Sequence, residues 1–490
     1  MNAERIKALH SRYNPQAEAE RYINSLSLGE NIRYFILIEP GLGYIAVPLK
    51  KKYPDAKIIS LHAGEQFEGQ PGLTEAINSQ WFPATGLSIQ DFLEREIPDT
   101  EASQLRLLEW RPALAVYGKA YITLVEEAAI FIKRSDANAR TIKSFGKRWF
   151  RNFFNNLTLL RNVICPGEGN VLALSQPLLI TGAGPALEEI IPRIKNEWNR
   201  NSFFILAASS SVLALKAQGL TPDMLISTDG SGWAKLHLYE FFRSAETRKK
   251  TSTLAAALIA ALPSQCENLP LLLISDGSFW QTILLTKFNV PFITLPQRGT
   301  VSATALDLAF TLTNDDVFFA GMDLGNQDIR SHSRPYSFDR LIDEKATRLN
   351  PAYCQSYNRS SKLKAGGSYA VYASWFEKQL SSYPKRLHSL GNNNSLFSSL
   401  EATNVYLKKM KKIPAKAANF KSINLNPEGN LGRKALAFLQ NVLKDPLQTH
   451  QSKILEDELK TLLFPGTTIS KNDLVKALEA AAGFGCGKNE

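Results

Sequence analysis

Short apolar runs alternate with helical patterns from about Leu172 onward, and this alternation constrains the fold more than any other feature of the chain. The segments "PLLITGAGPAL", "SFFILAASSSVLALKAQGL" and "DMLISTDGSGWAKLHLYEFF" each have the pattern of a strand, a turn and a helix. The runs "LPLLLISDGSFW" and "DDVFFAGMDL" add further strands, and "GTVSATALDLAFTL" has helical apolar spacing. Strands that alternate with helices predict a central doubly wound, Rossmann-like α/β domain.

The rest of the chain predicts three flanking parts. A chain of 490 residues is long enough for two or three domains with substantial cores. The segment "NIRYFILIEPGLGYIAVPLKKKYPDAKIISLH" has a strand, helix and strand pattern, which predicts a smaller N-terminal α/β domain over residues 1–110. Helical apolar spacing predicts a helical connector over 111–170, before the Rossmann-like domain at 171–375. A C-terminal helical region is expected over 376–490.

Composition indicates a globular protein without a membrane span. Hydrophobic residues make up 44% and charged residues 21% of the chain. The longest apolar run, "LAAALIAAL", is far shorter than the roughly 20 residues that a membrane helix needs. The N-terminus is charged throughout, which predicts no signal peptide, and the four cysteines are scattered without zinc-site spacing. Reduced thiols and a cytoplasmic location fit this pattern. The net charge of +11 is consistent with a basic surface or with an anionic partner.

Polar and small residues follow the predicted strands, where an open parallel sheet binds its ligands. Gly182 and Gly184 would let backbone approach a ligand, and the helix start at Pro185 would offer free N–H groups to a phosphate. The alternatives are an ordinary strand–helix turn and, for the serine run, a helix cap. Together the strand ends favour a site for a nucleotide or another phosphorylated ligand. The candidates are Gly182, Ala183, Gly184, Pro185, Ser209, Ser210, Ser211, Asp229, Arg298, Gly299, Thr300 and Ser302.

The stretch "FFAGMDLGNQDIRSH" ends the last of these buried strands in polar groups. Asp323 would bind ribose or acceptor hydroxyls, or it would cap a loop through backbone N–H groups. His332 is either a catalytic residue or a solvated loop histidine. Asp323, Asp328 and His332 match no dedicated metal motif, so no metal site is predicted.

Three segments in this order resemble one protein family. They are "GAGPALEEIIPRIK", "AASSSVLALKAQGLTPDMLISTDG" and "RGTVSATALDLAFTLTNDDVFFAGMDLGNQDIRSHS". They are similar to the motility accessory factor (Maf) family, whose central domain is called MptE-like after an archaeal 6-hydroxymethylpterin diphosphokinase. The segments "WRPALAVYGKAY" and "FGKRWFRNFFNNL" resemble the connector of that family. The resemblance covers most of residues 20–375.

The resemblance implies a glycosyltransferase. Maf proteins are associated with glycosylation of flagellin by nonulosonic acids, and their central domain is similar to an inverting bacterial sialyltransferase that uses no metal. The implied donor is a CMP-linked nonulosonic acid, the implied acceptor is flagellin Ser or Thr, and no tightly bound cofactor is implied. By the same resemblance, His332 would be the base, with Asp323 beside it and Tyr336 as a further candidate. The implied nucleotide contacts are Gly182, Ala183, Gly184, Pro185, Ser209, Ser210, Asp229, Gly299, Thr300 and Ser302.

The loop differs from the sialyltransferase pattern, and two other functions stay open. Ala183 stands where that pattern has asparagine, and Ala186 stands where it has serine. One alternative is an MptE-like diphosphokinase, which would need Mg²⁺ to bridge the phosphates of ATP. The other is a non-catalytic protein that binds a nucleotide-sugar or flagellin. No nucleic-acid partner is expected, and the sequence predicts no particular oligomeric state.

Overall fold

The chain forms two compact units. The first comprises Met1–Gly146 with Phe464–Thr467, and the second comprises Lys147–Leu463 with Thr468–Glu490. A computed structural model describes residues 9–29, 32–69, 75–97, 104–167, 173–196, 200–243, 253–325, 329–365, 373, 376, 386–390, 418–425, 430–444, 450–467 and 469–484.

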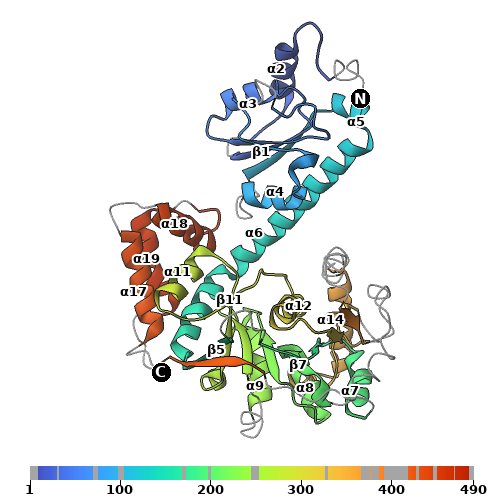
Figure 1. Cartoon of the computed structure of the whole chain (residues 1–490), viewed down its shortest axis with the longest axis vertical. Coiled ribbons are helices and arrows are strands. Elements are labelled where there is room, and N and C mark those ends of the chain that lie inside the picture. Colours follow the sequence, from blue (N-terminus) through green and yellow to red (C-terminus); the bar gives the residue numbers. More distant parts are fainter. Residues whose placement is uncertain are drawn as a thin grey trace. The chain divides into compact units, whose positions relative to one another are not determined.

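The first unit is built on a four-stranded parallel sheet with the order β3-β2-β1-β4 (Figure 1). It contains the strand–helix–strand pattern that the sequence predicts, as β1, α3 and β2. Its elements are α2 (Pro15–Ser25), β1 (Tyr34–Ile38), α3 (Ala46–Lys52), β2 (Lys57–Leu61), β3 (Ser79–Trp81), η1 (Pro83–Thr85), α4 (Ile89–Glu96), β4 (Leu105–Glu109) and α5 (Pro112–Tyr117).

A buried polar chain joins the ends of β1 and β2. The Ser60 hydroxyl lies 2.9 Å from Nε2 of His62, and Nδ1 of His62 lies 3.4 Å from Oε1 of Glu39. All three side chains are fully buried. The chain pairs polar groups that would otherwise be costly to bury.

The long helix α6 (Lys119–Leu159) has 41 residues and begins in the segment that the sequence predicts as a connector. The division between the two compact units falls inside it, after Gly146. The expected connector at 111–170 also contains β5 (Asn162–Pro166), which belongs to the sheet of the second unit. The unit boundaries therefore differ from the predicted ones, because helical spacing does not reveal where a helix passes from one core to another.

The second unit contains a ten-stranded, largely parallel sheet, which agrees with the predicted Rossmann-like α/β class. The strand order is β13-β12-β6-β7-β8-β9-β10-β5-β14, and β11 pairs with β10. Every pairing is parallel except that of β14 with β5. The strands are β5, β6 (Leu178–Thr181), β7 (Phe204–Ala208), β8 (Met224–Ser227), β9 (Thr253–Ala257), β10 (Leu271–Ser275), β11 (Ile293–Thr294), β12 (Val317–Ala320), β13 (Leu387–Ser389) and β14 (Phe420–Asn424).

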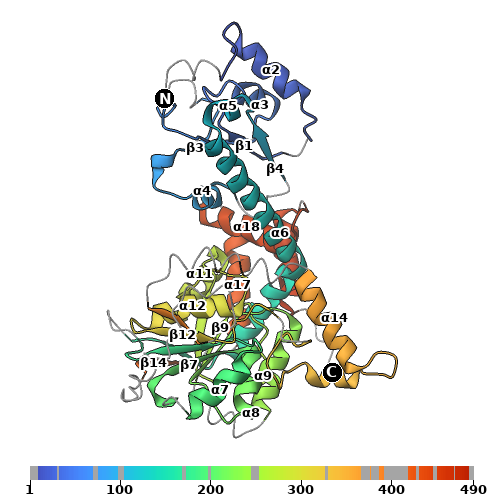
Figure 2. The same cartoon turned by 90° about the vertical axis from the view of Figure 1, so that its right-hand side faces the viewer.

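Helices cover both faces of this sheet. Figures 1 and 2 show α12 (Val301–Leu312) on one face, while α7 (Leu187–Asn196), α8 (Val212–Ala217) and α9 (Lys235–Phe242) lie on the other. The central strands are buried on both faces, which explains their continuous apolar runs in the sequence. The helix α14 (Ala352–Ala365) follows the short helix α13 (Asp339–Glu344), and the 3₁₀ turns of this unit are η3 (Arg200–Ser202), η4 (Ser209–Ser211), η5 (Gly232–Ala234) and η6 (Ser264–Cys266).

The C-terminal part is more than the helical region that the sequence predicts. It contributes both edge strands of the sheet, β13 and β14. These strands are short, and β14 is mostly exposed, so they lack the apolar pattern that reveals a buried strand. The helices α17 (Leu431–Lys444), α18 (His450–Leu463) and α19 (Lys471–Ala482) pack with each other and with α11 (Phe279–Lys287). The carboxylate of Glu458 on α18 accepts the first two N–H groups of α11.

Candidate functional site

The sheet of the second unit has a switch point between β6 and β12. From β6 the chain adds β7, β8, β9 and β10 on one side, whereas β12 lies on the other side. Loops that leave neighbouring strands in opposite directions open a crevice at such a point, and ligands of doubly wound folds bind there. The loops concerned are Gly182–Pro185 after β6 and Gly321–Asp323 after β12.

These two loops pack directly against each other. Gly182 donates its N–H to the carbonyl of Ala320 at 2.8 Å, and Gly184 donates to the carbonyl of Gly321 at 2.7 Å. A Cβ atom on Gly182 would meet the Gly321 carbonyl, and one on Gly184 would lie 2.5 Å from Oδ2 of Asp323. These two glycines therefore allow the loop after β6 and the loop after β12 to lie close to each other.

Asp323 caps the helix that follows β6. Its Oδ2 accepts the N–H of Ala186 at 2.7 Å, next to the buried Pro185. Burial raises the pKa of Asp323, the Ala186 hydrogen bond lowers it, and the charge of Glu189 raises it. The sequence left open a ligand contact and a loop cap for Asp323, and the geometry is that of the cap. The carboxylate fills the helix start at which a phosphate was expected.

His332 lies over the loop that follows β6. The next residue, Ser333, donates its N–H to the carbonyl of Ala183 at 2.8 Å, which holds the segment in place. The imidazole of His332 stacks on the ring of Tyr336, with centroids 4.2 Å apart and planes at 17°. Its Nδ1 lies 2.8 Å from the hydroxyl of Ser331. His332 is thus a partly buried, oriented ring and not the solvated loop histidine of the alternative interpretation.

Burial and nearby positive charge keep His332 neutral. Desolvation lowers the pKa of His332 to about 3, and the positive charges of Arg359, His237 and Arg334 act in the same direction. The neutral ring can accept a proton at pH 7, but it is a weak base in this environment.

Tyr336 is the centre of an aromatic and cationic cluster. His237 and Phe338 lie 5.3 Å and 5.2 Å from it, measured between ring centroids. The Arg359 guanidinium lies 5.4 Å from its ring centroid and donates to its hydroxyl at 3.4 Å. Burial raises the pKa of Tyr336 to about 12, so the hydroxyl keeps its proton near pH 7.

Asp229 belongs to the surroundings of this cluster. Its carboxylate accepts the N–H of Ser231 at 2.7 Å, and its charge raises the pKa of both His237 and Tyr336. Burial, the largest effect, lowers the pKa of His237 to about 4. His237 is not predicted from the sequence, because a histidine in a short, largely apolar helix gives no sign of its neighbours in space.

The serine run has a structural role at the end of β7. Its three residues form the short helix η4, in which Ser209 and Ser211 are buried and Ser210 is partly buried. The Ser211 hydroxyl lies 3.0 Å from the hydroxyl of Thr181, at the end of β6. The run therefore joins the ends of two neighbouring strands.

The segment before α12 forms a helix cap. The Thr300 hydroxyl accepts the N–H of Ala303 at 3.1 Å, and Gly299 has a φ of 75°. Ser302 lies in the first turn, and Arg298 pairs with Asp307 at 2.6 Å. In the described part of the chain, this segment makes no hydrogen bond to His332, so the two are not joined directly.

Two asparagines on α6 hold the strand-end loops together. Asn152 donates its amide N–H groups to the carbonyls of Gly230 and Ile259, at 3.0 Å and 2.9 Å. Asn156 donates to the carbonyls of Leu258 and Ala260, at 2.7 Å and 2.8 Å. The sequence analysis missed them, although two amides four residues apart within an aromatic run are a signal of buried polar contacts.

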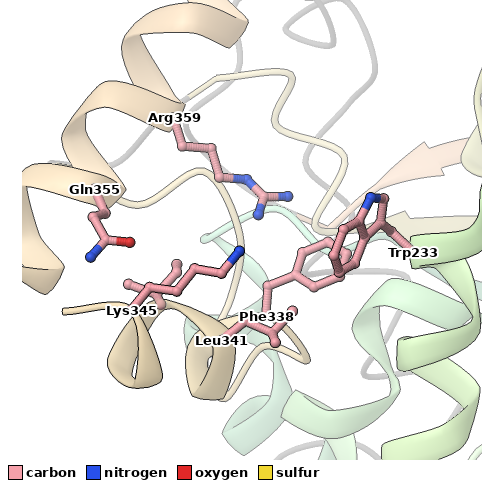
Figure 3. Close-up of a pocket in the computed structure, with 7 residues that line it drawn as sticks. Trp233, Phe338, Leu341, Lys345, Gln355 and Arg359 are labelled. Carbon is pink, nitrogen blue, oxygen red and sulfur yellow. The ribbon is translucent and has the colours of Figure 1, made fainter.

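A cavity of about 370 Å³ lies beside the Tyr336 cluster (Figure 3). It is lined by Trp233, Phe338, Leu341, Ile342, Lys345, Gln355 and Arg359.

Among the described residues, no group of three or more His, Cys, Asp or Glu side chains is arranged to hold a metal, and Asp328 lies outside those residues. No helix among the described residues is both long and apolar enough to cross a membrane.

Residues 130–328 match the family model described as 6-hydroxymethylpterin diphosphokinase MptE-like. This segment contains the switch-point strands, and the match agrees with the MptE-like central domain that the sequence resemblance predicts. A protein of Treponema pallidum (strain Nichols), called an uncharacterized protein, is 28% identical over 293 residues. The match covers 60% of this chain, and the chain spans 61% of that relative. The chain is also similar to the structure of a Maf glycosyltransferase from Magnetospirillum magneticum AMB-1. That match has a TM-score of 0.46 and 13% identity, over 99% of this chain and 78% of the other.

Proposed function

We propose that this protein is a glycosyltransferase that transfers a CMP-linked nonulosonic acid to a Ser or Thr of a protein acceptor, with flagellin as the expected acceptor. The MptE-like domain at 130–328 and the sequence resemblance to Maf proteins support this class. No tightly bound cofactor forms part of the proposal.

The position of His332 carries the proposal. The ring of His332 stacks on Tyr336, and the next residue in the chain is hydrogen-bonded to the loop after β6. The hydroxyl of that residue, Ser333, is buried and has no hydrogen-bond partner among the described residues. A buried hydroxyl without a partner is costly, so a bound ligand or water would stabilise it. A base and an available hydrogen-bonding group thus lie at the switch point.

Donor binding would strengthen this base. An inverting transfer requires that the acceptor hydroxyl lose its proton as it attacks, and His332 would accept that proton. The charge of Arg359 contributes to the low pKa of His332. Burial is the largest cause of that low pKa and would remain, whereas an anionic donor bound near Arg359 would offset the positive charge and so raise the pKa of His332 in part. The histidine would therefore act as a base chiefly when the donor is in place.

Turnover of a His332→Ala variant tests this role. With a CMP-linked nonulosonic acid as donor and purified flagellin as acceptor, we expect kcat to fall about 10²- to 10⁴-fold. Donor affinity should stay near that of the wild type, because the base faces the acceptor. Ser331→Ala removes only the hydrogen bond to Nδ1 and should cost much less. Near-normal turnover of His332→Ala would exclude this residue as the base.

The family description favours one alternative, a diphosphokinase that uses Mg-ATP. A thermal-shift screen against CMP, ADP and ATP, each with and without Mg²⁺, separates the two activities. A ligand at about 100 times its Kd should add about 2.7 kcal/mol to the unfolding free energy. Stabilisation by CMP without Mg²⁺ supports the glycosyltransferase. Stabilisation by Mg-ATP alone supports the diphosphokinase.

A further inference from the structure

The cavity beside the Tyr336 cluster is lined by two cations that point toward a common space. Figure 3 shows the Lys345 ammonium, at the end of α13, and the Arg359 guanidinium, on α14, reaching into it from two different segments. Among the described residues, none that lines the cavity is acidic. In the described part of the chain, neither cation has a carboxylate within salt-bridge distance. The cavity therefore has an excess of positive charge.

Two acidic residues in the segments that carry the cavity are paired with other cations. Asp339 pairs with Arg334 at 2.6 Å, and Glu344 pairs with Arg340 at 2.8 Å. The excess charge of the cavity thus remains, and it suits an anionic ligand group. An arginine with a lysine beside it binds carboxylate or phosphate through charge-assisted hydrogen bonds.

Aromatic rings form the opposite wall. Trp233 and Phe338 make an edge-on contact with centroids 6.4 Å apart, and Trp233 is 59% exposed. The Lys345 ammonium lies 5.9 Å from the Trp233 centroid, and the Arg359 guanidinium lies 4.7 Å from that of Phe338. An exposed tryptophan beside two cations that have no carboxylate partner among the described residues is suited to a ligand that has both an apolar face and a negative charge.

A third feature is an amide group at the rim. Gln355 donates its Nε2 hydrogen to the carbonyl of Asn350 at 3.0 Å, and in Figure 3 its oxygen lies on the side of the two cations. This oxygen can accept a hydrogen bond from a ligand hydroxyl. The lining therefore offers a site for a carboxylate, an apolar ring face and a hydroxyl within one cavity.

We propose that this cavity is the sugar subsite, in which Arg359 and Lys345 bind the carboxylate of an acidic monosaccharide while its C–H face packs on Trp233. The choice of an acidic sugar rests on the proposed function. In a nonulosonic acid the carboxylate is bonded directly to the anomeric carbon. Arg359 also contacts Tyr336, on which His332 stacks. Binding of the carboxylate by Arg359 would thus hold the reacting carbon near the proposed base.

Tryptophan fluorescence of the full chain can test the subsite with free sugars. The probe is N-acetylneuraminic acid, and its neutral counterpart is N-acetylmannosamine. We expect the acidic sugar to quench fluorescence, and Trp233→Phe to remove most of that signal. Lys345→Gln and Arg359→Gln should each weaken binding of the acidic sugar about ten- to a hundredfold. Lys362→Gln makes the same charge change at an exposed position of α14 outside the cavity and should leave affinity unchanged.

Several outcomes would overturn the subsite. They are equal affinity for the neutral sugar, unchanged affinity in both cation variants, and no binding of the acidic sugar at all. Titrations with CMP and with inorganic phosphate test a phosphate subsite, and loss of their binding in the cation variants would assign the cavity to the nucleotide instead. Circular dichroism and Tm show whether Arg359→Gln folds, and the exposed Lys345 provides a variant that does not depend on the packing of Arg359.

The subsite and the proposed function can fail separately. Transfer of the sugar by the wild type, with cation variants that bind the acidic sugar normally, would reject the subsite and leave the glycosyltransferase. Binding of the acidic sugar that depends on Arg359 and Lys345, without transfer from any CMP-linked sugar, would reject the glycosyltransferase and leave the subsite.

Discussion

The carboxylate of Asp323 accepts the backbone N–H of Ala186 at 2.7 Å, so the loop after β12 caps the helix after β6. These two strands are neighbours in the sheet but lie more than 130 residues apart in the chain. The cap fixes the switch point from which the proposed site is built. It also places a negative charge at the helix start, which offsets the positive end of the helix dipole.

Replacement of Asp323 should destabilise the second unit. Asp323→Ala leaves the Ala186 N–H without its partner, and we expect a loss of about 1–3 kcal/mol in the free energy of unfolding. Asp323→Asn keeps an acceptor oxygen and should lose less. Urea unfolding measures both, with Asp343→Ala on an exposed surface as the control. Unchanged stability together with lost ligand affinity would instead make Asp323 a ligand contact.

A side chain at Gly184 should also destabilise this loop pair. A Cβ atom there would lie 2.5 Å from Oδ2 of Asp323 and 2.8 Å from the Gly321 carbonyl, so Gly184→Ala forces the loops apart. We expect a cost of about 1–3 kcal/mol. Gly232→Ala is the control, because a Cβ atom at Gly232 meets nothing within 4 Å. A stable Gly184→Ala protein that binds no nucleotide would show that this glycine serves the ligand and not the loops.

Asn156→Asp should be the most damaging change on α6. The buried amide donates to two carbonyl oxygens, and an aspartate would present a negative oxygen to both. A buried charge without a partner costs about 3 kcal/mol or more. Asn155→Asp makes the same change at an exposed position of the same helix and should alter stability by less than about 0.5 kcal/mol. Comparable stability of the two variants would contradict the hydrogen-bonding role of Asn156.

Stability should fall with acid through the two low-pKa histidines. The folded protein holds the pKa of His237 at about 4 and that of His332 at about 3, both below the ordinary value of 6.5. As pH falls below about 6.5, the unfolded chain takes up protons that the folded chain does not, so folding loses free energy. Each histidine contributes a slope of up to about 1.4 kcal/mol per pH unit until its folded pKa is reached.

Urea titrations at several pH values between 7 and 4.5 check this dependence. His237→Asn should reduce the slope by about one proton, and the double variant with His332→Asn should reduce it further. A slope that is the same in the wild type and in both variants would show that the two rings are protonated in the folded state at these pH values.

The local sequence was enough to predict the central α/β class and the strand–helix–strand pattern of the first unit. Buried parallel strands are short apolar runs, and the helices between them have a visible period, so neighbours along the chain specify both. The edge strands could not be found in this way. β14 pairs with β5 across more than 250 residues, and neither its length nor its exposure distinguishes it from a loop.

The sequence by itself determined the buried strands, the helices between them and the polar residues that end those strands. The tertiary structure decided what those residues do. It set Gly184 against Asp323, and it brought His237 and Arg359 to Tyr336 from helices far from each other in the chain. The physical reason is the distance over which each effect acts. Strand and helix patterns depend on residues a few positions apart, whereas burial, the charges that shift a pKa and the walls of a cavity depend on distances in space that only the folded chain sets.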